Sequence, residues 1–223
     1  MKKTGPECIL ERTKDTTIVP SIFYYGNYVY VLNSWLVRAE EKSVYEIVRW
    51  NTESKVLENI MYLETDGNHG DAESIWVEDE QNVYFSVTSD EDLFTNVYLI
   101  NENEVSKVIE FGAWGGIRLQ QGAAVWFNMN EDRSALAVKI CDYSGNKIYE
   151  GTLSSEYYEG IEGPDGEGFG FSGFSALMGD SHNLILIEHI RSEKSSKEMA
   201  FLVRYTITPN GAEHHLLGKT FWR

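Results

Sequence analysis

Carboxylates and aromatic rings are interspersed in one glycine-rich segment of the chain, residues 154–170. Carboxylates can pair with Arg or Lys, and Tyr or Trp rings supply rigid contact area with few rotatable bonds to immobilise. Segment 90–94 carries both residue types, segment 64–73 carries carboxylates, and segment 112–115 carries Trp114. An acidic rim around aromatic anchors suits a basic protein surface, so these segments are candidate binding sites. The candidate residues are Glu156, Tyr157, Tyr158, Glu159, Glu162, Asp165, Trp114, Asp66, Asp71, Asp90, Asp92 and Phe94.

The segment Asp66-Gly-Asn-His-Gly-Asp-Ala-Glu73 has oxygen ligands around two glycines, a composition that could wrap Ca²⁺. It lacks the full spacing of an EF-hand loop and the bidentate glutamate that ends one. The neighbouring His214 and His215 would point to opposite faces of a strand and therefore could not bind one metal ion. We expect a turn-rich loop at 66–73, and neither a metal nor a cofactor.

Motifs for covalent catalysis are incomplete as well. Gly170-Phe-Ser-Gly173 superficially resembles a nucleophile elbow, but such an elbow needs a strand-to-helix turn and no helix is expected after it. An acidic face always offers carboxylate pairs at separations suited to glycoside hydrolysis, so such pairs carry little specificity. We expect no catalytic residues and no enzyme activity, with a carbohydrate-binding or glycoside-processing protein as the alternative.

The charge balance narrows the classes of partner. The formal net charge is −16, from 35 acidic and 19 basic residues. Binding to nucleic-acid phosphates or anionic membranes depends on Lys and Arg, so neither partner is expected. The start of the chain has no apolar stretch of a signal peptide, and no apolar run approaches the roughly 18 residues of a membrane span, so a cytoplasmic location is expected. Two cysteines, Cys8 and Cys141, provide no disulfide framework.

Short apolar runs separated by polar turns recur in the same order four times along the chain. The units cover about residues 16–63, 72–111, 116–153 and 171–220, and each contains four runs of strand type. A repeat of roughly 40–50 residues with four strands is typical of a β-propeller blade. We therefore predict one all-β domain, a small β-propeller of about four four-stranded blades, with a five-bladed ring or a twisted β-sandwich as alternatives. The residues Glu7–Arg12 could join the last blade and close the ring.

Two details of this pattern can be checked separately. The only segments compatible with a short helix are Ser154–Glu159 and Trp35–Lys42. Trp50, Trp76 and Trp126 lie in expected strands and should pack between blades, whereas Trp114 lies in a glycine-rich connection and should be exposed.

The lengths of the connections distinguish the two faces of the predicted disc. First-to-second and third-to-fourth turns are short and share one face, because strands within a blade run up and down. Second-to-third loops and the crossings between blades share the other, which we call the long-loop face. Long loops on one side of a compact scaffold are where binding usually resides. Its connections are Trp35–Ser43, Ser89–Thr95, Asn130–Ala135, Ile190–Lys197, Glu64–Glu73, Gly112–Gly115 and Ser154–Gly170.

All twelve candidate residues fall on the long-loop face or at its margin. The sequence therefore predicts a non-catalytic protein-binding module that recognises a basic protein through this face. Its sharpest form is an immunity or inhibitor protein against a cationic toxin or nuclease, because matched charges raise association rate and specificity.

Overall fold

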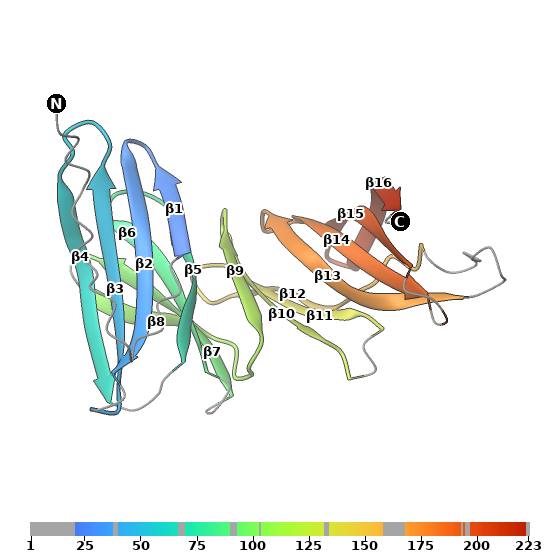
Figure 1. Cartoon of the computed structure of the whole chain (residues 1–223), viewed down its shortest axis with the longest axis horizontal. Coiled ribbons are helices and arrows are strands. Elements are labelled where there is room, and N and C mark those ends of the chain that lie inside the picture. Colours follow the sequence, from blue (N-terminus) through green and yellow to red (C-terminus); the bar gives the residue numbers. More distant parts are fainter. Residues whose placement is uncertain are drawn as a thin grey trace.

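The computed structural model describes residues 21–37, 40–66, 70–89, 93–102, 104–131, 134–157, 168–192, 194 and 197–221. These residues form sixteen β-strands in four antiparallel sheets of four strands each (Figure 1). None of the described ranges contains a helix that is long and apolar enough to cross a membrane. The predicted all-β architecture of four four-stranded blades is confirmed.

Each sheet uses four strands that follow one another in the sequence. Sheet 1 contains β1 (Ser21–Tyr25), β2 (Tyr28–Val37), β3 (Lys42–Asn51) and β4 (Leu57–Asp66). Sheet 2 contains β5 (Asp71–Val77), β6 (Asn82–Ser89), β7 (Phe94–Asn101) and β8 (Glu104–Glu110). Sheet 3 contains β9 (Gly116–Gln120), β10 (Ala123–Met129), β11 (Leu136–Cys141) and β12 (Lys147–Leu153). Sheet 4 contains β13 (Phe169–Gly179), β14 (Asn183–Ser192), β15 (Glu198–Thr208) and β16 (Gly211–Phe221).

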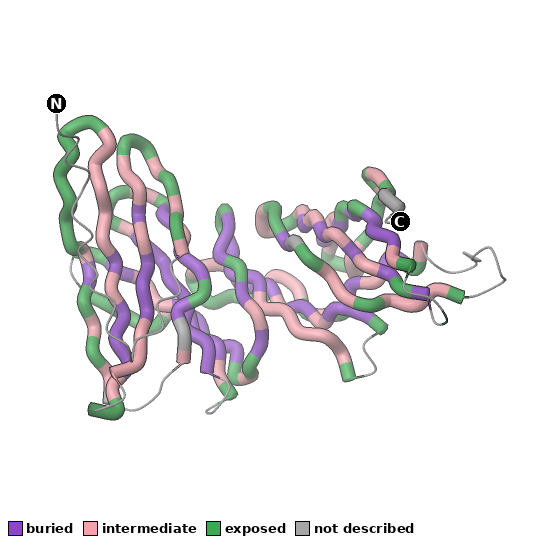
Figure 2. The backbone as a smooth tube through the Cα atoms, viewed as in Figure 1, coloured by how far each residue is buried: buried purple, intermediate pink, exposed green. Residues whose placement is uncertain are grey.

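The alternation of side chains along the strands places apolar residues on both faces of the middle sheets. On β6, Phe85 and Val87 pack toward sheet 1, whereas Tyr84 packs toward sheet 3. Successive residues of a strand point to opposite faces, so a run that is apolar throughout must lie between two packed sheets. Three buried cores result, one between each pair of consecutive sheets (Figure 2).

The four sheets follow one another in an open arc. The first strands of successive sheets lie beside each other, with β5 between β1 and β9, and β13 next to β9. Sheets 1 and 4 lie at opposite ends of the arc, with sheets 2 and 3 between them (Figure 1). The predicted closing segment Glu7–Arg12 lies outside the described residues.

The described residues of the two segments compatible with a short helix are not helical, and the expectation for Trp50 was wrong. Residues 35–37 continue β2 and Lys42 begins β3, because the paired run extends from Tyr28↔Asn51 to Val37↔Lys42 and leaves no room for a helix. Residues 154–156 of the other compatible segment are also non-helical. Trp50 lies on the face of sheet 1 that points away from sheet 2, and Lys55 Nζ is 5.0 Å from the centre of its ring.

The other two strand tryptophans agree with the prediction. The Trp76 ring contacts Phe23 of sheet 1 edge-on, with ring centres 5.0 Å apart. The Trp126 ring stacks on Phe111 and belongs to the core between sheets 2 and 3.

Candidate functional site

The two sets of connections lie at opposite ends of the strands, but they differ less in length than the sequence predicts. The first-to-second and third-to-fourth turns have two to five residues each. At the other end, the long-loop face, the connections 38–41, 67–70, 90–93, 111–115, 130–135 and 193–197 have four to six residues, and the connection 154–168 has fifteen.

Four predicted residues lie at or next to strand ends of sheets 1 and 2, although Trp114 is on the side of sheet 2 that faces sheet 3. Asp66 ends β4 and Asp71 begins β5, so both border the crossing 67–70. Phe94 begins β7 beside it. The connection that carries Trp114 reaches the same strand, because Thr95 Oγ1 donates to the Gly115 carbonyl at 3.3 Å. Trp114 is 47% exposed, in agreement with the prediction.

The remaining predicted residues lie elsewhere or outside the described chain. Glu156 is exposed at the junction of sheets 3 and 4. Tyr157 is half-buried and packs edge-on against His214, with ring centres 5.1 Å apart, so it is part of a core and not a free anchor. Six further candidates fall outside the described ranges, namely Tyr158, Glu159, Glu162, Asp165, Asp90 and Asp92.

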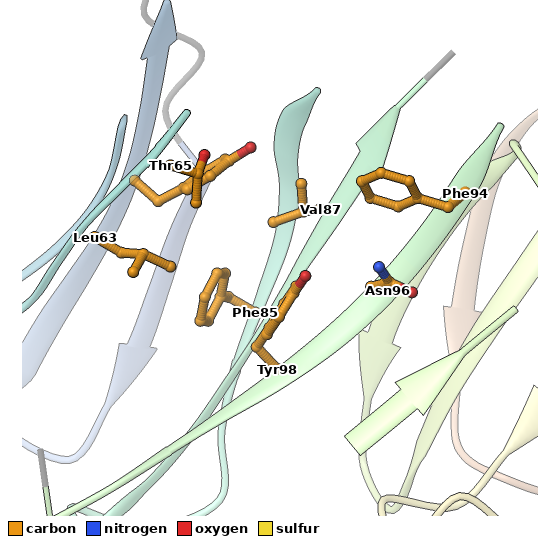
Figure 3. Close-up of a pocket in the computed structure, with 8 residues that line it drawn as sticks. Leu63, Thr65, Phe85, Val87, Phe94, Asn96 and Tyr98 are labelled. Carbon is orange, nitrogen blue, oxygen red and sulfur yellow. The ribbon is translucent and has the colours of Figure 1, made fainter. Parts of the chain in front are cut away.

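An aromatic cavity opens between sheets 1 and 2 at their long-loop ends (Figure 3). Its volume is about 270 Å³, enough for one large side chain or a small ligand group. Sheet 1 contributes one wall through β3 and β4, and sheet 2 contributes the other through β6 and β7. The lining residues are Tyr45, Leu63, Thr65, Phe85, Val87, Phe94, Asn96 and Tyr98.

The walls of this cavity are held by contacts that leave one polar atom without a partner. The rings of Phe85 and Tyr98 stack with centres 5.2 Å apart, and Tyr45 OH donates to the Gly70 carbonyl at 3.0 Å. Asn96 is 7% exposed, and its Oδ1 has no hydrogen-bond partner among the described residues. A buried amide oxygen without a partner is costly, so this atom is an acceptor available for a ligand donor.

Gly70 fixes the crossing at the edge of the cavity. Its φ is +88°, and a Cβ at this position would lie 1.8 Å from the Thr88 carbonyl oxygen. Only glycine therefore fits here, because any side chain would overlap the backbone of β6. This contact holds Gly70, the residue before β5, against the end of β6.

A second polar feature lies at the start of the acidic segment 154–168. Glu188 of β14 is 2% exposed and accepts hydrogen bonds from Ser155 Oγ at 2.5 Å and from Tyr205 OH. Burial first, and then the Glu188 charge, raise the pKa of Tyr205 above its ordinary value. This buried carboxylate ties the first residues of the segment to sheet 4, and both its oxygens have partners within the chain.

The sequence did not identify most of the cavity walls. Tyr45, Phe85 and Tyr98 look like ordinary core residues, since each sits inside an apolar strand. The available signal was Asn96, an amide within the run Phe94-Thr-Asn-Val-Tyr-Leu-Ile. No group of three or more potential metal ligands occurs in the part of the chain that the structure describes.

No protein-family model and no curated protein matches this sequence. Solved structures give weak similarities. The acylaminoacyl peptidase of Pyrococcus horikoshii is 12% identical, with a TM-score of 0.49 over 94% of this chain and 39% of that chain. TolB from Acinetobacter baumannii is 11% identical, with a TM-score of 0.43 over 86% of this chain and 49% of that one.

A third similar structure is the GH93 alpha-L-arabinofuranosidase of Fusarium graminearum in complex with arabinobiose. It is 11% identical, with a TM-score of 0.45 over 86% of this chain and 65% of that one. The chain thus spans less than two thirds of each of these three proteins. Identities this low leave the function to be inferred from the chain's own residues.

Proposed function

We propose that this chain is a non-catalytic protein-binding module whose long-loop face binds a basic protein. In this proposal a Lys or Arg side chain of the partner enters the cavity between sheets 1 and 2. The observation that carries the proposal is the aromatic cavity, with the unpartnered amide oxygen of Asn96 in its wall. An immunity or inhibitor protein against a cationic toxin or nuclease is the specific form that we favour.

The chemistry of the cavity suits a cationic side chain with an aliphatic stem. The faces of Tyr and Phe rings attract a cation within about 6 Å, and the gain rises when water is excluded. Rings of Tyr45, Phe85, Phe94 and Tyr98 line the cavity, and the Asn96 amide oxygen can accept an N–H hydrogen bond. The stem of Lys or Arg would cover the apolar surface of Leu63 and Val87.

The surrounding charge supports the same partner. The net charge of −16 gives the whole molecule a negative field that attracts cations. Asp66 ends β4, the strand whose Leu63 and Thr65 line the cavity, and Asp71 begins β5, so two acidic residues lie close to the cavity in the sequence. Such charges act mainly on the association rate and on the choice of partner.

A second candidate is a carbohydrate-binding or glycoside-processing protein. Aromatic side chains with a few convergent polar groups also describe a small-molecule site, and the Asn96 amide could bind a sugar hydroxyl. The two candidates differ in their dependence on salt, because attraction between exposed charges is screened and stacking on aromatic rings is not.

The experiment compares three kinds of probe on the same immobilised protein. These are an Arg-rich peptide, a Glu-rich peptide of equal length, and an array of oligosaccharides, each measured at low and at high salt. We expect binding of the Arg-rich peptide that weakens with salt, and no binding of the other two. Salt-independent oligosaccharide binding, with no peptide binding, would contradict the proposal and favour the second candidate.

A further inference from the structure

Among the residues that the structure describes, two sheet faces of the arc have no neighbouring sheet. Sheets 2 and 3 are packed on both sides, whereas the described residues pack sheet 1 on sheet 2 alone and sheet 4 on sheet 3 alone. The remaining face of sheet 1 and the remaining face of sheet 4 lie at opposite ends of the molecule (Figures 1 and 2). Each of these faces could form one side of a sheet-on-sheet interface, of the kind that forms three times between the sheets of the chain itself.

The free face of sheet 1 exposes large apolar side chains along its first strand. Ile22 is 66% exposed and Tyr24 is 63% exposed, while Phe23 between them packs toward sheet 2. On the third strand of this face, Glu46 accepts hydrogen bonds from the side-chain amides of Asn59 at 2.9 Å and Asn33 at 3.4 Å. The face therefore combines an apolar inner strand with a fixed carboxylate farther out.

The free face of sheet 4 carries the complementary features on the equivalent strands. Met178 on its first strand is 56% exposed, and Arg204 on its third strand is exposed. The described residues give Arg204 no acidic partner. A shallow apolar groove of about 280 Å³ lies on the same sheet, and Gly218 leaves room there for a side chain from outside. Its lining residues are Ile187, Ala200, Leu202, Gly218 and Lys219.

We propose that a second copy of this chain covers both faces, sheet 4 of each copy packing on sheet 1 of the other. Within the chain, the first strands of consecutive sheets lie side by side. The same arrangement between copies places Met178 beside Ile22 and Tyr24, and places Arg204 on the strand equivalent to that of Glu46. Two arcs joined in this way form a ring of eight blades, within the usual range of about four to eight.

The symmetry of this assembly explains why two copies are enough. A head-to-tail contact forms a closed ring when the rotation between copies closes, and an open filament when it does not. In the two-copy ring each chain uses its sheet 1 face once and its sheet 4 face once, and no sheet face remains bare. The inference is independent of the proposed function, because neither face includes the cavity.

The first measurement is the mass of the full chain in solution by sedimentation equilibrium. We expect twice the monomer mass of 25.5 kDa. The variants Tyr24→Glu and Leu202→Glu place a charge on the sheet 1 face and on the sheet 4 face, and each should be monomeric by itself. Val105→Glu is the matched control, because Val105 is an exposed apolar residue of sheet 2, and it should remain dimeric.

Mixing the two monomeric variants distinguishes a head-to-tail contact from other dimers. A mixture of Tyr24→Glu with Leu202→Glu retains one intact contact, from sheet 4 of the first variant to sheet 1 of the second. We expect heterodimers in this mixture and monomers in each separate sample. Circular dichroism of each variant checks that it is folded, and the charge exchange of Glu46→Arg with Arg204→Glu gives a second, milder pair for the same mixing test.

Three results would overturn the proposal. The wild-type chain could be monomeric at about 100 µM, well above the micromolar dissociation constants of ordinary weak complexes. Either variant alone could remain dimeric. This would happen if the two copies paired through the same face of each, either sheet 1 on sheet 1 or sheet 4 on sheet 4. The wild type could also form a larger ring or a filament, which would exclude closure by two copies.

Discussion

At the scale of single residues, Phe94 is the wall of the cavity best suited to a test of the proposed site. Phe94 is half-buried at the start of β7, so its ring borders both the cavity and the solvent. Phe85, by contrast, is fully buried and also supports the core. Phe94 is therefore the wall residue whose removal should affect binding with the least effect on folding.

We predict that Phe94→Ala weakens binding of an Arg-rich peptide by about tenfold, because loss of one partly desolvated cation–π contact costs about 1–2 kcal/mol. Fluorescence anisotropy of a labelled peptide measures the change. Leu217→Ala is the control, since Leu217 is exposed on sheet 4 far from the cavity, and its affinity should equal that of the wild type. Equal affinities for all three proteins would place the peptide elsewhere.

The buried pair of Tyr205 and Glu188 should matter for stability. Tyr205→Phe removes a hydrogen bond to a buried carboxylate, and we predict a loss of about 1.5–3 kcal/mol in the free energy of unfolding. Tyr62→Phe is matched to it, because Tyr62 donates to Glu64 at 2.8 Å on the surface and should cost much less. Urea unfolding of both variants tests the difference, and equal losses would contradict it.

Alkaline pH should destabilise the fold through its buried tyrosines. Burial raises the pKa of Tyr84 to about 12, and the pKa values of Tyr143 and Tyr205 are raised as well. The folded state keeps these protons while the unfolded chain loses them above pH 10. Stability is therefore complete below pH 10 and falls as the pH rises toward 12.

Each such tyrosine contributes a slope of up to about 1.4 kcal/mol per pH unit. Urea unfolding at a series of pH values should therefore show a shallower decline for Tyr205→Phe than for the wild type. Equal slopes of the free energy of unfolding against pH in the two proteins would show that Tyr205 does not contribute to the loss of stability at alkaline pH.

At the scale of the elements, three of the short turns are closed by the same device. Asp79, Asp142 and Asp180 each lie one or two residues after the end of a strand. Each accepts hydrogen bonds from backbone N–H groups of the turn and from an asparagine side chain that follows. Asp residues favour such turns because the carboxylate replaces a missing backbone acceptor. These aspartates stabilise the turns of the short-turn face, at the opposite ends of the strands from the proposed binding site.

We predict that Asp142→Ala lowers the free energy of unfolding by about 1–2 kcal/mol, whereas Asp142→Asn, which keeps an acceptor, loses less. The hydrogen bond from the Asn146 side chain is the main cause that lowers the pKa of Asp142 below its ordinary value of 3.8. Its contribution is therefore present above about pH 4 and is lost as the pH falls. Urea unfolding at pH 7 and pH 3 should show a smaller difference between Asp142→Ala and wild type at pH 3.

The elements were largely predictable from the sequence, but the site was not. Strands depend on local signals, namely the alternation of side-chain polarity in runs such as Val83-Tyr-Phe-Ser-Val87 and the polar turns between runs. The four blades of four strands therefore agree with the prediction. The cavity joins Thr65 of sheet 1 to Phe94 of sheet 2, and such proximity depends on how two sheets pack. Tyr157 shows the same limit, because its sequence context resembles a loop anchor although it packs on His214.

At the scale of the whole molecule, the excess of acidic residues should set the salt dependence of partner binding. We predict that affinity for an Arg-rich peptide falls by about tenfold or more between 50 and 500 mM NaCl, since the Debye length shrinks from about 14 to about 4 Å over this range. Isothermal titration calorimetry measures the change. An affinity that is constant over this range would contradict the role of charge.

The two-copy ring would also place both cavities on one side. A two-fold axis along the axis of the ring keeps the long-loop faces of both copies pointing in the same direction. A partner with two basic segments could then bind both copies, and the gain would follow the effective concentration of the second segment. This arrangement connects the assembly to the proposed function without being required by it.

The most direct test of the central claim is a hydrogen-exchange map of the protein with and without a bound Arg-rich peptide. We predict slower exchange in the long-loop ends of β4, β6 and β7, around Thr65, Val87 and Phe94, and no change in the short turns at Asp79, Asp142 and Asp180. Protection centred on those short turns, or a bound peptide that protects neither region, would contradict the proposal that this cavity receives a basic side chain.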